Sequence, residues 1–311
     1  MLATLDRGGR ARLRSCGGPG AGAWLLAVPT EDATALADGD FTTAARLRLG
    51  QAVCLRGDLC HNVYATDRPG HHGRAPRRGT RCRRPLDILG VHGLTCPVGG
   101  RRTRRHDSVR DTLVPLLERA GYHVACEVHV PAWDIPGGAP HRRDRRAVLD
   151  LRLEAPPDAP LVYCDVVVAH PEAQRGAAAA AARDGATAAR AAANKHRRYP
   201  ADRAPLGRLV PLAVEPYGRW GNEALRFFKA AAARTVARTA ALGNLGDAAV
   251  PAVLGSWMAR LSVALQRGNA ECARAATAEV PPEPAEAPDL EAAVADLLAR
   301  AEAHAACSVG A

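Results

Sequence analysis

The sequence predicts a mixed α/β fold in which a central sheet is flanked by helices. Residues 147–153 and 161–169 are short apolar runs joined by a proline-rich turn, which is typical of a two-stranded hairpin. An alanine-rich segment, the composition that most favours a helix, separates this hairpin from another apolar run at 209–214. From residue 107 the patterns give the order helix, strand, strand, strand, helix, strand, helix, which indicates helices packed on a sheet.

The N-terminal third carries weaker signals. Residues 1–53 are rich in Gly and Ala and become helical around Phe41 to Gly50. Residues 54–81 show no periodicity, which predicts a loop. Residues 82–105 are compact and rich in Cys, His and Arg.

Periodicity predicts the remaining elements. Apolar residues recur at helical spacing from 107 to 120, and Gly121 supplies a stop. Residues 122–130 alternate between apolar and polar side chains, which predicts a strand. The later expected elements are a helix over 172–198, helices at 223–240 and 253–267, a proline-rich acidic linker at 280–290 and a final helix at 290–306.

The charge of the chain indicates a polyanionic partner. The formal net charge is +10, and Lys195 and Lys229 are the only lysines, so nearly all basic residues are arginine. The guanidinium group is a planar, permanently charged fork that matches phosphate, which favours nucleic acid. The codon bias of a GC-rich genome accounts for part of the arginine excess but not for its clustering.

The cysteines and the length of the apolar runs indicate the cellular compartment of the protein. Nine cysteines are spread over the chain, and the N-terminus does not resemble a secretory signal. This distribution argues against a disulfide scaffold and favours a reducing compartment, nuclear or cytoplasmic, over secretion. No apolar run reaches the ~18–20 residues of a membrane helix, so no membrane partner is expected.

Two aspartates on the predicted hairpin form the first candidate site. With the turn centred near Pro157, Asp150 lies directly across from Asp165. Facing carboxylates repel each other, and a hard divalent cation such as Mg²⁺ removes the repulsion. The alternative is a structural ion pair with a nearby arginine. Glu127 could reach the same site, although an outward glutamate on an alternating strand is unremarkable.

Lys195 follows the two aspartates on the alanine-rich helix. Two carboxylates on strands and a nearby lysine suit metal-assisted cleavage of a phosphodiester. On the sequence alone, a surface lysine is the simpler interpretation.

A Cys/His segment forms the second candidate site. Cys82, His92 and Cys96 are spaced as ligands suited to zinc, which binds thiolate and imidazole in a tetrahedral shell. A fourth ligand must come from elsewhere, and Cys60 is the first choice with Cys54 as the second. The alternative is that these are three unrelated residues in a basic loop. A short loop without apolar content needs a cross-link to be ordered, however, which favours a bound metal.

Two arginine clusters are candidate phosphate-binding segments. One leads into the helix predicted from residue 107, whose backbone donors favour anions. The other precedes the strand of Asp150. For any single arginine, a solvated charged segment is an equally good interpretation. The arginines are Arg101, Arg102, Arg104 and Arg105 in the first cluster and Arg142, Arg143, Arg145 and Arg146 in the second.

Together these segments resemble the C-terminal region of non-LTR retrotransposon proteins, in which a restriction-enzyme-like endonuclease follows the reverse transcriptase and a small Cys/His knuckle. The resemblance covers nearly the whole chain, and the order and spacing of the pieces carry it. Fourteen residues separate Asp150 from Asp165, which fits the spacing in the family. The matching pieces are 16–24, 41–50, 82–92, 99–107, 148–150, 165–171, 195–199, 214–218 and 265–269.

The resemblance implies a PD-(D/E)XK nuclease fold, preceded by a zinc-knuckle-like segment and followed by helices. Asp150 and Asp165 would hold Mg²⁺, and Lys195 would orient water and offset charge on the phosphate. Tyr199 and Glu215 match family positions with supporting roles. The expected segments are a helical linker after an absent polymerase (1–53), the knuckle and basic segment (54–105), the endonuclease core (106–240) and a C-terminal helical extension (241–311).

The chain departs from the family pattern at several positions. Leu149 stands where the family often has proline, and Val91 replaces an acid before the histidine. The first cysteine of the knuckle is displaced or lost. Val167 stands where members of the nuclease fold have their lysine, so activity would depend on Lys195.

The sequence thus predicts a Mg²⁺-dependent DNA endonuclease that nicks target DNA for target-primed reverse transcription, with a structural Zn²⁺. DNA, the RNA of the element and its reverse transcriptase domain are the expected partners. The first alternative is an inactive nucleic-acid-binding remnant that uses the knuckle and the arginine clusters. The second is a purely structural remnant that neither binds nor cleaves.

Overall fold

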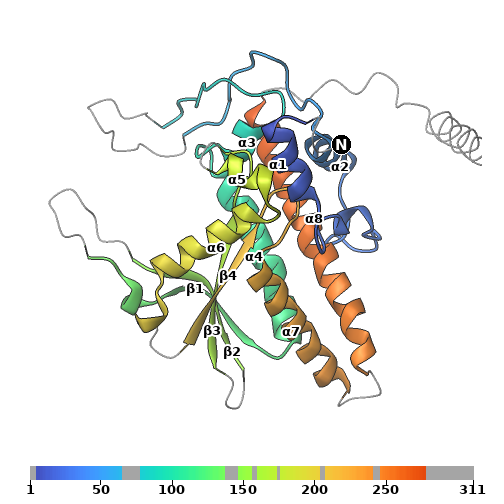
Figure 1. Cartoon of the computed structure of the whole chain (residues 1–311), viewed down its shortest axis with the longest axis vertical. Coiled ribbons are helices and arrows are strands. Elements are labelled where there is room, and N and C mark those ends of the chain that lie inside the picture. The colour runs from blue at the N-terminus through green and yellow to red at the C-terminus, as the bar shows by residue number, and fades with distance from the viewer. Residues whose placement is uncertain are drawn as a thin grey trace, which may run out of the picture. The chain divides into compact units, whose positions relative to one another are not determined.

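The computed structural model describes residues 5–64, 78–136, 146–155, 160–173, 176–203, 207–240 and 246–277. These residues belong to one compact unit, Met1–Ala278. Arg142, Arg143 and Arg145, the linker at 280–290 and the helix at 290–306 lie outside the described residues, and the predicted segment boundaries stay a prediction. The helices are α1 (Arg7–Cys16), α2 (Asp38–Leu49), α3 (Val91–Thr95), α4 (Arg101–Arg119), α5 (Ala177–Ala182), α6 (Ala186–Arg198), α7 (Asn222–Ala240) and α8 (Val250–Ala276), and the strands are β1 (His123–His129), β2 (Val148–Glu154), β3 (Leu161–Val168) and β4 (Gly207–Val214) (Figure 1).

The strands form a mixed sheet, which confirms the predicted fold class of a central sheet flanked by helices. In the described part of the chain the strand order is β1-β2-β3-β4. β2 is antiparallel to both β1 and β3, whereas β4 is parallel to β3 because the chain crosses over through α5 and α6. Leu151 pairs with Cys164 and Leu153 with Val162, which is the register predicted from the turn. Asp150 and Asp165 therefore face each other on the two central strands.

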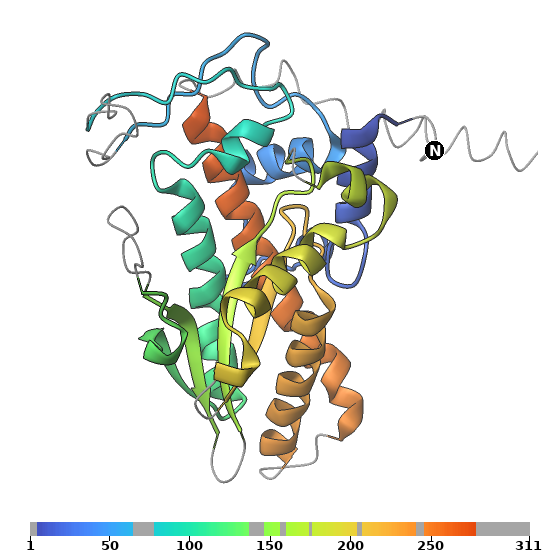
Figure 2. The ribbon, with the colours of Figure 1, turned by 60° about the vertical axis from the view of Figure 1, so that its left-hand side comes forward.

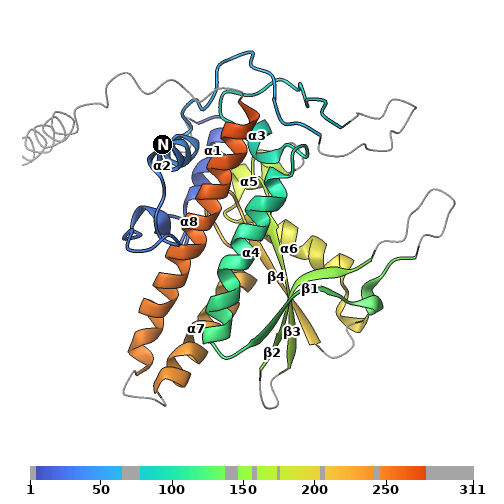
Figure 3. The same cartoon turned by 180° about the vertical axis from the view of Figure 1, so that it is seen from behind.

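Apolar residues cover both faces of the sheet. On one face, α4 and α7 bury residues such as Leu113 and Phe228 against Leu212 of β4. α8 lies along α4 and α7 rather than on the sheet, as Figure 3 shows. α6 lies on the opposite face (Figure 2). Its small alanines, such as Ala188, pack closely on Ala213, the neighbour of Leu212 in β4. Helices from two layers can thus reach the central strands.

The start of α4 differs from the prediction. Gly100 adopts a left-handed conformation (φ 71°) and begins the helix at Arg101 rather than near Asp107. The first arginine cluster therefore forms the first turns of a helix instead of preceding one. α8 also extends to Ala276, beyond the predicted end.

Glycines explain two further differences. The predicted helix over 172–198 is two helices, because Gly185 (φ 65°) separates α5 from α6. α1 was not predicted, since its sequence contains Gly8 and Gly9, which disfavour a helix. The carboxylate of Asp6 accepts a hydrogen bond from the backbone N–H of Gly9 at 2.6 Å and caps this helix.

Two glycines of α8 provide a matched test of the packing between α8 and α4. A Cβ atom at Gly268 would lie 2.5 Å from Cγ of Arg105, whereas one at Gly255 would meet nothing within 4 Å. We expect Gly268→Ala to lower the free energy of unfolding by about 1–3 kcal/mol, because α8 and α4 must separate. Gly255→Ala should raise it by up to about 1 kcal/mol, because alanine favours a helix. Urea denaturation measures both changes, and equal responses would contradict this packing.

Candidate functional site

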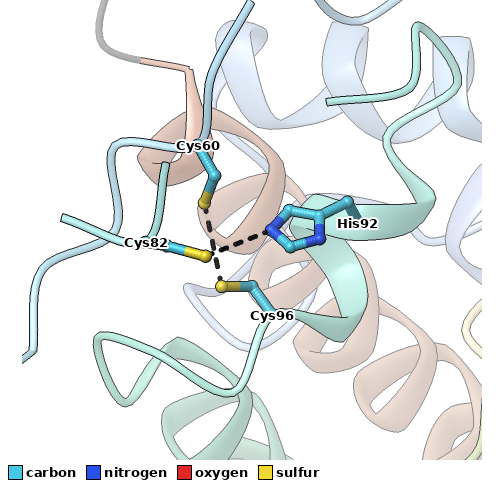
Figure 4. Close-up of side chains that lie close together, drawn as sticks. All are labelled: Cys60, Cys82, His92 and Cys96. Atoms are coloured by element: carbon cyan, nitrogen blue, oxygen red, sulfur yellow. Dashed lines mark hydrogen bonds between the residues drawn. The ribbon is translucent and has the colours of Figure 1, made fainter. Parts of the chain in front are cut away.

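Three cysteines and a histidine from separate segments converge on one point. Cys60 and Cys82 lie in loops, His92 lies in α3, and Cys96 directly follows that helix (Figure 4). The Sγ atoms of Cys60 and Cys96 are 3.7 Å apart, and Cys82 Sγ is 3.6 Å from His92 Nε2. One ligand atom from each residue lies within 4.8 Å of the others. This cysteine cluster could hold a metal ion.

Local hydrogen bonds decide which residues join the cysteine cluster. The carboxylate of Asp87 accepts the backbone N–H groups of Val91 and His92, which caps α3 and directs His92. Cys54 instead donates to the backbone carbonyl of Asp87 at 3.1 Å, and it does not take part in the cluster. Cys60, the first choice from the sequence, therefore completes the group.

The two aspartates of the hairpin form a second cluster with residues from both helical layers. Asp150 Oδ2 accepts hydrogen bonds from the backbone N–H of Val166 at 2.6 Å and from His106 Nε2 of α4 at 3.0 Å. Lys195 Nζ of α6 donates to Asp165 Oδ2 at 2.6 Å. Ligand atoms of His106, Asp150 and Asp165 lie within 4.8 Å of one another. We call these four side chains the carboxylate cluster, and it contains every residue that the sequence predicted as catalytic.

Burial controls the protonation of the carboxylate cluster. Asp165 is 4% exposed, and burial together with the neighbouring charge of Asp150 raises its pKa to about 7 even though Lys195 opposes the shift. Burial also disfavours an ionised Asp150, but the hydrogen bonds from His106 and Val166 outweigh it and lower the pKa of Asp150. Burial disfavours the imidazolium form of His106, yet its hydrogen bond to Asp150 raises the pKa of His106 to about 9. Without a divalent cation, protons and cationic side chains balance the two carboxylates.

A cleft of about 490 Å³ opens beside the carboxylate cluster. His106 and Arg102 of α4 and Lys195 of α6 line it, together with apolar residues at the end of β3 such as Val167. A cleft that carries these basic groups suits an anionic ligand.

The arginines of the first cluster have three different environments. Arg102 is exposed and lines the cleft. Arg101 and Arg104 both form ion pairs with Glu271 of α8. Arg105 borders the same cleft, but it is buried and its guanidinium donates to Asn269 Oδ1 at 2.9 Å, so its role in phosphate binding stays a prediction. In the second cluster Arg146 lies near His129 Nδ1 (3.0 Å), and the other arginines fall outside the described residues.

The two residues expected in supporting roles do not touch the carboxylates. Tyr199 is buried against Trp133, and Lys195 Nζ lies 5.9 Å from the centre of its ring. The buried carboxylate of Glu215 accepts the backbone N–H of Ala188 at 3.1 Å, in the first turn of α6. Glu215 thus holds the helix that carries Lys195.

The sequence reasoning overlooked His106. This residue directly precedes the helix predicted from residue 107, although His106, Val109 and Leu113 share one helical face and the latter two are buried. Extending the apolar period of α4 by one turn would have directed His106 at the sheet. Glu127, in contrast, is exposed and forms an ion pair with Arg110 at 2.7 Å.

No family model matches this chain, and a search of curated proteins found no match. Among the helices in the described ranges, none is both long enough and apolar enough to cross a membrane.

The raised pKa of Asp165 predicts a pH-dependent stability. Its folded-state pKa of about 7 exceeds the ordinary value of 3.8, so this group stabilises the fold fully below about pH 4 and loses that contribution as the pH rises through 7. Asp165→Asn stays neutral at every pH. In EDTA, the free energy of unfolding of the wild type should therefore fall between about pH 5 and pH 8 by at least about 1 kcal/mol more than that of the variant. Urea denaturation at both pH values tests this expectation, and a constant difference would contradict it.

Proposed function

We propose that this chain is a metal-dependent DNA endonuclease that nicks target DNA. The observation that carries the proposal is the pair of carboxylates, Asp150 and Asp165, which face each other on adjacent strands. Lys195 donates a hydrogen bond to Asp165. The three residues come from different elements but meet beside a cleft with basic side chains. This arrangement is suited to cleavage of a phosphodiester.

The donor set of the carboxylate cluster fits a divalent cation. Two carboxylate groups lie within 4.8 Å of each other, one of them deeply buried, and a cation between them would offset their repulsion. Asp150 and Asp165 would hold Mg²⁺, which polarises the scissile phosphate and lowers the pKa of the attacking water.

The other side chains contribute charge and orientation. Lys195 Nζ donates a hydrogen bond to Asp165 and also lines the cleft. It would therefore offset negative charge on the reacting phosphate and orient the attacking water. Arg102 lines the same cleft and would bind a backbone phosphate. Glu215 acts through α6, whose first turn it holds, and so positions Lys195. Hydrolysis would form a bond between phosphorus and the water oxygen and break the bond between phosphorus and the 3′ oxygen, which leaves a 3′-hydroxyl and a 5′-phosphate at the nick.

The resemblance to non-LTR retrotransposon proteins supplies the biological setting of the proposal. In that setting the 3′-hydroxyl primes reverse transcription, and the partners are the reverse transcriptase domain and RNA of the element. The fold class agrees with a restriction-enzyme-like core, in which a mixed sheet is flanked by helices. The nucleus is the compartment in which such a reaction would take place.

We further propose that the cysteine cluster holds a structural Zn²⁺. Three thiol groups and one imidazole are a ligand set that zinc prefers. Burial, together with the neighbouring thiols, raises the pKa of Cys60 to about 12, so thiolates at this place need a cation. Zinc would join the loops of Cys60 and Cys82 to α3.

The nuclease proposal predicts nicking of supercoiled plasmid by the purified chain. Relaxed circles should form with Mg²⁺ or Mn²⁺ and not with EDTA. Asp165→Asn and Lys195→Ala should each reduce the rate by about 100-fold or more, because the first removes a ligand of the cation and the second removes a positive charge beside the reacting phosphate. Lys229→Ala is the matched control, since Lys229 is the only other lysine and is exposed on α7.

Circular dichroism would confirm that each of these variants is folded. Salt-sensitive DNA binding without nicking, under either metal, would contradict the enzyme and support the nucleic-acid-binding alternative.

The zinc proposal predicts about one bound zinc per chain by elemental mass spectrometry. Cys96→Ser should lose this zinc and lower the melting temperature, because the buried ligands lose their cation. Cys54→Ser should keep the zinc, since Cys54 lies outside the cysteine cluster. Zinc loss in both variants or in neither would contradict the assignment.

A further inference from the structure

His106 stands at the carboxylate cluster in the position of a ligand rather than of a surface histidine. Its Nε2 atom lies 3.0 Å from Asp150 Oδ2 and 3.1 Å from the carbonyl oxygen of Val166. One of its ring nitrogens also lies within 4.8 Å of a carboxylate oxygen of Asp165. His106 thus lies beside both carboxylates that the proposed function assigns to a cation, with Nε2 directed at Asp150.

The other ring nitrogen of His106 has a partner of its own. Nδ1 lies 3.1 Å from Asp107 Oδ1, and Arg110 Nη1 lies 3.5 Å from the same carboxylate oxygen. In metal sites, a coordinating histidine commonly donates its second N–H to a carboxylate, which sets the tautomer and the orientation of the ring. Asp107 would hold the proton at Nδ1 and leave the lone pair of Nε2 directed at the cluster.

The backbone that carries His106 is held rigidly. The preceding residue, Arg105, is 3% exposed and donates to Asn269 Oδ1 of α8 and to the backbone carbonyl of Leu94 in α3. A ligand on such a segment is positioned before the cation arrives, which favours tight binding.

We propose that His106 is the third protein ligand of the cation site, with Asp107 as its positioning residue, and that the site prefers Mn²⁺ to Mg²⁺. This inference rests on the proposed function, because it assumes that Asp150 and Asp165 hold a cation. Mg²⁺ is bound in proteins almost entirely by oxygen. Mn²⁺ also takes oxygen ligands, but as a first-row transition metal it accepts an imidazole nitrogen more readily than Mg²⁺ does. Binding releases the Nε2 proton to solvent, and the Nε2 lone pair forms the new bond.

Electron paramagnetic resonance of Mn²⁺ tests this proposal on the full, zinc-loaded chain. We expect the wild type to bind Mn²⁺ at least about 10-fold more tightly than Mg²⁺, measured by competition at one pH. The spin-echo spectrum should show coupling to an imidazole nitrogen. His106→Ala should weaken Mn²⁺ binding by about 10-fold or more, abolish the nitrogen coupling and leave Mg²⁺ binding less affected.

Two further variants sharpen the test. Asp107→Asn should weaken Mn²⁺ binding by about 10-fold while it retains the nitrogen coupling. His123→Ala is the matched control, because His123 is an exposed histidine of β1 outside the cluster, and it should change neither quantity.

The outcomes separate this inference from the proposed function. If Asp165→Asn abolishes Mn²⁺ binding while His106→Ala changes neither the affinity nor the nitrogen coupling, His106 is not a ligand although the cation site exists. If the wild type binds neither ion, the cation site and the proposed nuclease both fail. An absent nitrogen coupling in the folded wild type would overturn the inference whatever the variants show.

Discussion

The pair of aspartates on the central strands is the constraint on which the rest of the architecture depends. Asp165 is nearly buried, and a buried carboxylate is costly unless a positive charge or several donors accompany it. The hairpin register sets Asp150 opposite it, which adds repulsion. One basic side chain from each helical layer offsets these negative charges: His106 of α4 contacts Asp150, and Lys195 of α6 contacts Asp165. Both helices must therefore be placed accurately at the end of β3.

Other buried polar groups secure that placement. Glu215, buried at 2% exposure, holds the first turn of α6, and Arg105 ties α4 to α8 and to α3. Loss of one partner leaves a buried polar group without a hydrogen bond, which costs about 1–3 kcal/mol. An arginine adjacent to a candidate metal ligand thus connects three helices of the fold. Arg102, His106 and Lys195 line the cleft with their basic groups, and the buried Arg105 borders it.

The cysteine cluster and the carboxylate cluster are joined through a short path. α3 carries His92 of the first cluster, and the carbonyl of Leu94 in the same helix accepts a hydrogen bond from Arg105. His106 follows Arg105 directly. A cation in the cysteine cluster would order α3 and, through Arg105, the start of α4. With a cation bound, the Cys/His segment would therefore support the carboxylate cluster structurally.

The sequence by itself determined the features that rest on local physics. Periodicity predicted the order of elements, and a proline-rich turn predicted the register that sets Asp150 opposite Asp165, because a hairpin turn constrains pairing locally. The spacing of Cys82, His92 and Cys96 predicted their meeting, since α3 and the residues around it span little distance. Only the tertiary structure decided the contacts between distant segments: that Lys195 reaches Asp165, that His106 joins the cluster, and that Arg105 is buried on Asn269. These outcomes depend on how α4, α6 and α8 pack. The apolar period of α4 can place His106 on the inward face of its helix, but no local pattern encodes which groups of distant segments a side chain meets there.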